Sequence, residues 1–214
     1  KIESVKSYGA DVDLIDVTKV SRAARLAELV AKIEGARSCS PYDDPLVIAG
    51  NASLGAEIFE RETPDAIVVP VGGGGLSSGI VIARDLTDTS TDVVGAEPLL
   101  ANDAARSLRE EKRVANESEP QTIADGARTL SLGERNFEIL RRGLSGILEV
   151  TEEDIRAGVR LLFSALHLQV EPTGALAIGA MIANRAKFAG NRVCCVVSGA
   201  NVDPALYAQI ISFD

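Results

Sequence analysis

Four consecutive glycines, Gly72 to Gly75, follow directly after a continuous apolar run at residues 66–71. Unbroken apolar runs are typical of strands that are buried on both faces, which occur mostly in parallel sheets. A helix-like stretch of small residues continues from 76 to 84. Glycines between a buried strand and a helix let the backbone approach a ligand, and their N–H groups suit an anionic phosphate. A flexible turn is the alternative interpretation, although it would cost considerable chain entropy.

This glycine loop does not match either of two common phosphate-binding motifs. No Gly-Lys-Ser or Gly-Lys-Thr ending follows it, as a P-loop requires, and the spacing is not that of the dinucleotide fingerprint Gly-x-Gly-x-x-Gly. We therefore expect a phosphate group other than that of ATP or NAD.

Strand-like and helix-like patterns alternate along the rest of the chain. Period-two or continuous apolar patterns predict further strands at 11–17, 92–97, 146–150 and 193–197. Helical patterns cover 21–35, 48–62, 151–167 and 173–188, while 101–145 is polar and rich in loops, where we expect short helices. Such alternation predicts an α/β fold with an open parallel sheet and helices on both faces.

The charge balance narrows the range of partners. The chain has 214 residues and a formal net charge of −9. An acidic chain repels nucleic-acid phosphates and anionic lipid surfaces, so we expect no nucleic acid and no membrane as partners. No apolar run approaches the roughly 18 residues of a membrane helix. Three cysteines, Cys39, Cys194 and Cys195, are interpreted as reduced thiols of a cytoplasmic protein.

Ser198 follows the last predicted strand, within Ser198-Gly199-Ala200-Asn201. Ligands of open α/β sheets bind at the carboxyl ends of the strands, so this loop and the glycine loop are placed to face one pocket. A serine hydroxyl there can form a hydrogen bond with a ring nitrogen. A plain turn is the commoner meaning of Ser-Gly taken alone.

Three acidic residues are further candidates. Glu97 ends a predicted strand and Asp103 follows six residues later, so the two carboxylates and the carbonyls between them can hold a hard cation. Judged on these residues alone, solvated acids are the more common explanation. Glu171 precedes a predicted helix, where it either caps the helix or projects into the pocket.

Seven segments together resemble the fold-type II pyridoxal-phosphate (PLP) enzymes, and within them the serine/threonine dehydratase and serine racemase group. Their order and separation fit that group, and they extend over nearly the whole chain. The segments are Ser7-Tyr8-Gly9-Ala10-Asp11-Val12, Asp43-Asp44-Pro45-Leu46-Val47-Ile48-Ala49-Gly50, Pro70-Val71-Gly72-Gly73-Gly74-Gly75-Leu76, Gly95-Ala96-Glu97-Pro98, Thr122-Ile123-Ala124-Asp125-Gly126, Glu171-Pro172-Thr173-Gly174-Ala175 and Val197-Ser198-Gly199-Ala200-Asn201.

The resemblance implies a role for each candidate residue. Gly72, Gly73, Gly74 and Gly75 would bind the phosphate of pyridoxal 5′-phosphate, Ser198 would contact its pyridine nitrogen, and Glu171 would lie near the ring and that serine. The expected ligands of Mg²⁺ or another divalent cation are Glu97, the carbonyl of Ala101, and Asp103. The implied fold is the large domain of the tryptophan synthase β-like PLP enzymes at 41–214, with a remnant of the smaller domain at 1–40.

The implied reaction is the dehydration and deamination of a β-hydroxy amino acid, serine or threonine, to a 2-oxo acid and ammonia. Two alternatives stay open: an amino-acid racemase or other fold-type II enzyme, and a non-catalytic partner domain that binds phosphate or metal. The complete enzyme is expected to be a homodimer.

The sequence departs from the group in one important respect. The lysine that binds PLP covalently lies in a Ser-x-Lys-x-Arg-Gly motif in that group, and no lysine of this chain has such neighbours. The first residue is also Lys rather than Met. We therefore predict no catalytic residue here, and expect a fragment that is inactive alone.

Overall fold

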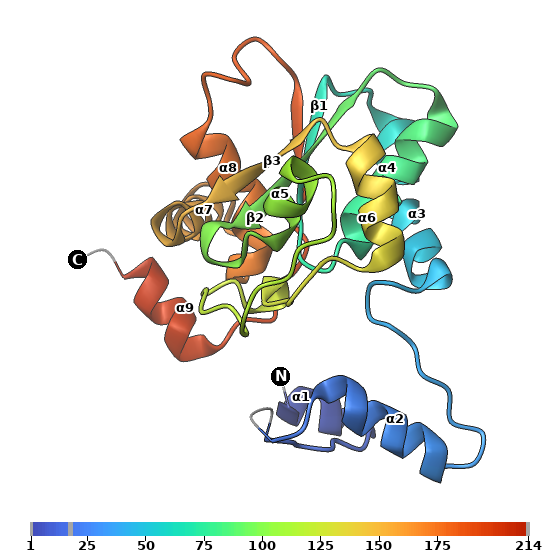
Figure 1. Cartoon of the computed structure of the whole chain (residues 1–214). Helices are drawn as coiled ribbons and strands as arrows, with labels where there is room; N and C mark the ends of the chain where they lie inside the picture. Colours follow the sequence, from blue (N-terminus) through green and yellow to red (C-terminus); the bar gives the residue numbers. More distant parts are fainter. Residues whose placement is uncertain (1, 17–18, 213–214) are drawn as a thin grey trace. The chain divides into compact units, whose positions relative to one another are not determined.

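The computed structural model describes residues 2–16 and 19–212, and its chain divides into two compact units, residues 1–40 and residues 41–214 (Figure 1). The first unit contains helices α1 (Ile2–Ser7) and α2 (Arg22–Lys32). The Ser21 side chain caps α2 by accepting a hydrogen bond of 3.1 Å from the N–H of Ala24. That this unit belongs to a smaller domain stays a prediction.

The strand predicted at 11–17 is wrong for its described part. Residues 10–16 form no regular secondary structure, and residue 17 lies outside the described residues. A strand must pair its backbone N–H and C=O groups with a neighbour. The described part of residues 1–40 contains no strand that would provide those partners, so the alternating pattern has nothing to pair with.

The second unit is built on a parallel sheet of four strands in the order β3-β2-β1-β4. All five residues of β1 are buried, which explains why this segment is continuously apolar. The predicted α/β fold is thus confirmed. The strands are β1 (Ala66–Pro70), β2 (Asp92–Pro98), β3 (Gly146–Val150) and β4 (Val193–Cys195).

Helices cover both faces of this sheet, as Figure 1 shows. Alternate residues of a strand point to opposite faces. Val68 and its neighbours Val94 and Ala96 therefore pack on one face, against α7 (Glu152–Leu166) and α8 (Leu176–Ala183).

Ile67 and Val69 point to the other face. There they join the core of α3 (Pro45–Arg61), α4 (Gly75–Thr87) and α6 (Glu134–Gly143). Because α4 follows β1 directly, the turn between them is fixed at both ends by buried structure.

Short elements complete the unit. The helix predicted at 173–188 is instead a 3-10 turn followed by α8, which ends at Ala183. The C-terminal helix α9 adds Ile210 to a small core with Val159 and Leu162 of α7. The short elements are η1 (Leu99–Ala101), α5 (Asp103–Arg109), η2 (Asp125–Ala127), η3 (Pro172–Ala175) and α9 (Pro204–Ile211).

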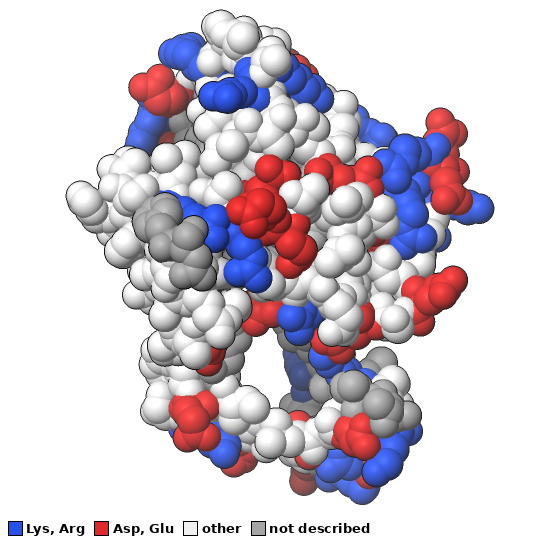
Figure 2. Space-filling view, turned by 90° about the vertical axis from the view of Figure 1, so that its left-hand side faces the viewer, with Lys and Arg blue, Asp and Glu red and all other residues white. Residues whose placement is uncertain are grey.

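The surface carries charges of both signs. Figure 2 shows basic and acidic side chains interspersed over the face in view. Within residues 2–16 and 19–212, no helix combines the length and apolar character needed to cross a membrane.

Candidate functional site

The glycine loop and Ser198 leave the sheet at the same edge. Strands β1 and β4 are parallel neighbours in which Val68 pairs with Cys195, and the N–H of Val196 donates to the Val68 carbonyl at 2.9 Å. Since parallel strands end at one edge, the segments that follow them emerge side by side. Both predicted loops therefore lie at the carboxyl edge of the sheet, where open α/β folds bind ligands.

Two further segments connect these loops. A Cβ added to Gly72 would lie 3.1 Å from the carbonyl oxygen of Gly126. The N–H of Gly126 donates to Oγ1 of Thr173 at 3.0 Å. A Cβ added to Gly174 would lie 2.5 Å from the carbonyl oxygen of Gly199. Close contacts thus link the glycine loop, through Gly126, the Thr173 hydroxyl and Gly174, to the residue after Ser198.

The glycine loop presents backbone donors at the start of α4. Gly74 is the N-cap, with φ +95°, and has no side chain to accept from the first turn. N–H groups in the first turn of a helix have no acceptor within the helix. In the described part of the chain, none of the four glycine N–H groups donates a hydrogen bond to another residue. This arrangement fits an anionic group such as a phosphate.

Ser198 and Glu171 occupy neighbouring positions. The Ser198 side chain is exposed, and the N–H of Glu171 donates to the Gly199 carbonyl at 3.1 Å. A Cβ on Gly199 would lie 2.5 Å from Oε1 of Glu171, so this carboxylate packs directly against the residue after Ser198. The Glu171 side chain does not cap η3. Of its two predicted roles, capping is therefore wrong.

Glu97 and Asp103 are not solvated acids, and that sequence-based interpretation is wrong. Their exposed fractions are 1% and 0%. Glu97 accepts the N–H groups of Ala104 and Ala105, each at 2.9 Å, and so anchors the first turn of α5. The spacing of two acidic residues does not reveal whether their side chains are buried. Here both carboxylates are buried because β2 ends inside the second unit.

The electrostatics of this acidic pair are unfavourable without a counterion. Burial, together with the charge of Asp103, raises the pKa of Glu97 well above its usual range. Burial raises the pKa of Asp103 to about 6. Asn116 donates to Oδ1 of Asp103 at 2.8 Å, whereas the buried Oδ2 has no hydrogen bond of normal geometry within the described residues.

The pair could hold a cation only with help from other oxygen atoms. Among the described residues, no group of three or more His, Cys, Asp or Glu side chains is placed to bind a metal. Ala101, the third predicted ligand, is 1% exposed and lies in η1, between the two acids in sequence. Backbone carbonyls are normal ligands of hard cations.

Sequence reasoning assigned no role to three residues that shape the glycine loop. The ring of Tyr42 lies where a Cβ of Gly73 would project, so it packs directly on the loop. Asn136 donates to the carbonyls of Tyr42 and Gly73, at 2.8 and 2.9 Å. Asp43 belongs to one of the seven segments that resemble the family. Tyr42 and Asn136 belong to no sequence motif that would have pointed to the glycine loop.

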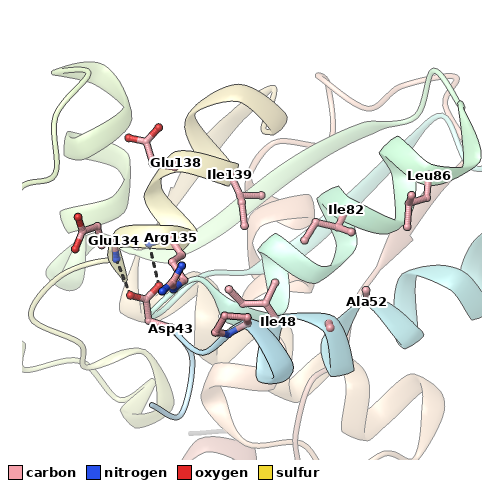
Figure 3. A pocket seen from close by; sticks show the side chains of 11 residues that line it. Asp43, Ile48, Ala52, Ile82, Leu86, Glu134, Arg135, Glu138 and Ile139 are labelled. Atoms are coloured by element: carbon pink, nitrogen blue, oxygen red, sulfur yellow. Dashed lines mark hydrogen bonds between the residues drawn. The ribbon is translucent and has the colours of Figure 1, made fainter. Parts of the chain in front are cut away.

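Asp43 lies at the polar end of a cavity of about 980 Å³ between α3, α4 and α6 (Figure 3). Its carboxylate accepts the N–H groups of Glu134 and Arg135 at 3.0 and 3.1 Å, as the dashed lines in Figure 3 mark. Asp43 is therefore the cap of α6, although it is about 90 residues away in sequence. The cavity is lined by Asp43, Pro45, Ile48, Ala49, Ala52, Ile82, Leu86, Glu134, Arg135, Glu138 and Ile139.

Comparison with known proteins identifies the family. The family described as "Pyridoxal-phosphate dependent enzyme" matches residues 1–199. The chain belongs to this family. The fold around the glycine loop and Ser198 is accordingly that of a PLP enzyme, and the resemblance inferred from seven sequence segments is confirmed.

Individual relatives of this PLP-family chain agree with the assignment. A serine racemase of Schizosaccharomyces pombe is 36% identical over 213 residues, which cover 99% of this chain and 65% of the relative. An L-threo-3-hydroxyaspartate ammonia-lyase of a Pseudomonas species is 34% identical over 212 residues, covering 99% and 66%. The crystal structure of a T.th. threonine deaminase superposes with a TM-score of 0.87 at 40% identity, covering 95% of this chain and 67% of that one.

The chain therefore spans 65% and 66% of the lengths of these two sequence relatives. All three are similar to this chain, and they are named a serine racemase, an L-threo-3-hydroxyaspartate ammonia-lyase and a threonine deaminase.

Proposed function

We propose that this chain holds PLP between the tetraglycine loop and Ser198, and that it serves the dehydration and deamination of a β-hydroxy amino acid to a 2-oxo acid and ammonia. The observation that carries the proposal is the convergence of the two loops at one edge of the sheet, on adjacent parallel strands. Membership of the PLP family supplies the identity of the cofactor.

The phosphate would be held by the glycine N–H groups at the start of α4. These donors have no partner in the described residues, and the positive end of a helix stabilises a negative charge. Side chains at these positions would collide with their surroundings, because Gly73 faces the Tyr42 ring and Gly75 lies against the Tyr42 backbone. Glycine is therefore required both for packing and for access to the N–H groups.

The ring nitrogen would be contacted by Ser198. A hydroxyl donates a hydrogen bond to a pyridine nitrogen without transferring its proton, so the ring stays largely neutral. PLP supplies an electron sink for carbanion chemistry, and a neutral ring is the weaker sink, which suits elimination of a β-hydroxyl group. Glu171 would stand beside this contact, since its carboxylate packs against Gly199.

A racemase is the second candidate, because a relative that is 36% identical is a serine racemase. The two reactions differ in their products. We expect the full-length protein that contains this chain to release pyruvate from serine or 2-oxobutyrate from threonine. Formation of D-serine without 2-oxo acid would instead favour the racemase. PLP binding without formation of either product would favour the third alternative, a non-catalytic domain that binds phosphate or metal.

The phosphate contact predicts a large difference between PLP and pyridoxal, which lacks the phosphate. Charge-assisted hydrogen bonds contribute about 1.5–3 kcal/mol each, so two of them correspond to at least roughly a hundredfold in Kd. Isothermal titration of the chain should show this preference, and inorganic phosphate should compete with PLP. Equal affinities for PLP and pyridoxal would contradict the proposed phosphate site.

We also propose that Glu97, the Ala101 carbonyl and Asp103 bind Mg²⁺ or another divalent cation. The support is the burial of both carboxylates together with the Asp103 Oδ2 atom, which lacks a hydrogen bond in the described part of the chain. Oxygen atoms of this kind are the ligands that hard cations prefer.

A divalent cation should therefore raise the melting temperature. A ligand at a hundredfold excess over its Kd stabilises by about 2.7 kcal/mol, which amounts to several degrees in a chain of this size. MgCl₂ or CaCl₂ should produce this shift in the wild type and not in Asp103→Asn. Asp85→Asn is the matched control, because Asp85 is 59% exposed. A shift of equal size in Asp103→Asn would exclude this site.

A further inference from the structure

Asn136 joins two backbone segments that are far apart in sequence. It is fully buried in the first turn of α6, and its Nδ2 donates to the carbonyls of Tyr42 and Gly73 at 2.8 and 2.9 Å. Two carbonyl acceptors fix which end of the amide is the nitrogen. The other end, Oδ1, has no hydrogen bond within the described residues. What this position supplies is thus a pair of donors.

The Gly73 carbonyl is held from two directions. Besides Asn136, the N–H of Gly133 donates to it at 3.1 Å. A peptide group is planar, and its C=O and N–H point in opposite directions. Fixing the carbonyl of Gly73 therefore fixes the direction of the N–H of Gly74, one of the proposed phosphate donors.

The next peptide group is fixed in the same way. The Gly74 carbonyl accepts the N–H of Ser78 at 2.9 Å and the hydroxyl of Ser77 at 3.1 Å. The N–H of Gly75 consequently has one direction as well. The carbonyls of Gly73 and Gly74 accept these four hydrogen bonds, and of the four only the bond from Asn136 comes from a side chain outside α4.

Asp43 determines where Asn136 stands. Its carboxylate accepts the N–H of Asn136 at 3.3 Å, in addition to those of Glu134 and Arg135 shown in Figure 3. Gly133 permits this approach, because a Cβ there would collide with the Asp43 carboxylate. The start of α6 is in this way tied to the loop that carries Tyr42.

We infer that Asn136 is a positioning residue for the cofactor phosphate: by holding the Gly73 carbonyl, it aims the N–H of Gly74 at the anion before the anion binds. The inference rests on the proposed PLP site and deepens it. It assigns a role in phosphate affinity to a side chain that does not itself touch the phosphate.

The test compares Asn136→Leu, which has similar volume but no donors, with Thr91→Val. Thr91 is a matched control: it is 3% exposed, and its hydroxyl donates to the Pro64 carbonyl at 2.7 Å, at the opposite, amino edge of the sheet. Both variants lose buried hydrogen bonds to backbone carbonyls, so both should melt at lower temperature. Asn136→Ser, which is smaller and also lacks the two N–H donors, replaces Asn136→Leu if the latter does not fold.

Isothermal titration should show PLP binding at least about tenfold weaker in Asn136→Leu, and within about twofold of wild type in Thr91→Val. Pyridoxal affinity should be the same in all three proteins.

Without any ligand, amide hydrogen exchange across residues 72–78 should be faster in the Asn136 variant only. A wild-type chain that does not distinguish PLP from pyridoxal overturns the proposed site and this inference together. The inference alone is overturned if the wild-type chain prefers PLP to pyridoxal while Asn136→Leu and Thr91→Val show equal PLP affinity and equal amide exchange.

Discussion

Gly74→Ala is expected to destabilise the second unit by about 2–5 kcal/mol and to abolish measurable PLP binding. A side chain at φ +95° costs about 1–2 kcal/mol in the left-handed region. The added Cβ would also lie 2.8 Å from Cβ of Asn136 and 3.1 Å from methyl groups of Leu132 and Leu140. All three neighbours are at most 1% exposed, so overpacking adds about 1–3 kcal/mol.

Gly190→Ala separates these two costs. Gly190 has φ +85°, and no atom lies within 4 Å of its added Cβ. Its replacement should therefore cost only the conformational term, about 1–2 kcal/mol, and leave PLP affinity unchanged. Urea denaturation at constant m-value measures both differences. Equal losses of stability in the two variants would show that the loop is not packed as described.

Glu97→Ala should have the second large effect, a loss of about 2–4 kcal/mol. The variant leaves the buried N–H groups of Ala104 and Ala105 without an acceptor, at about 1–3 kcal/mol each. Relief of the repulsion between Glu97 and Asp103 offsets part of this cost. The measurement is again the urea midpoint, in buffer without divalent cations.

Glu149→Ala is the natural comparison, since Glu149 pairs with Glu97 across strands β2 and β3. Its carboxylate forms a partly exposed ion pair with Arg109 at 2.7 Å and accepts a hydrogen bond from Nδ2 of Asn102 at 2.6 Å. Partly exposed contacts of this kind contribute about 1 kcal/mol or less each. If Glu149→Ala were as destabilising as Glu97→Ala, the anchoring of α5 by Glu97 would be refuted.

Local patterns predicted those parts of the fold that depend on burial along one segment. The continuous apolar run at 66–71 contains β1, and the helical pattern at 151–167 contains α7, whose first turn is capped by the Thr151 side chain accepting from the N–H of Asp154 at 3.2 Å. The strand predicted over residues 11–16 is absent, because an alternating pattern favours a strand but does not provide a neighbouring strand to pair with.

In the candidate site, likewise, the parts that follow from local patterns were predictable and the long-range contacts were not. Gly72 to Gly75 and Ser198 follow predicted strands, and parallel strands bring such segments to one edge. The contacts of Asn136 span 63 and 94 positions, and no periodicity relates residues so far apart. The burial of Asp103 depends likewise on Asn116 and α5 folding over the end of β2.

The most direct test of the shared PLP site is a titration of the ¹⁵N-labelled chain with PLP, followed by amide chemical shifts. We expect the resonances of Gly72–Gly75 and of Ser198–Gly199 to move together, with one Kd and a stoichiometry of one PLP per chain. Shifts confined to one of the two loops, or two different affinities, would contradict the claim that both hold the same molecule.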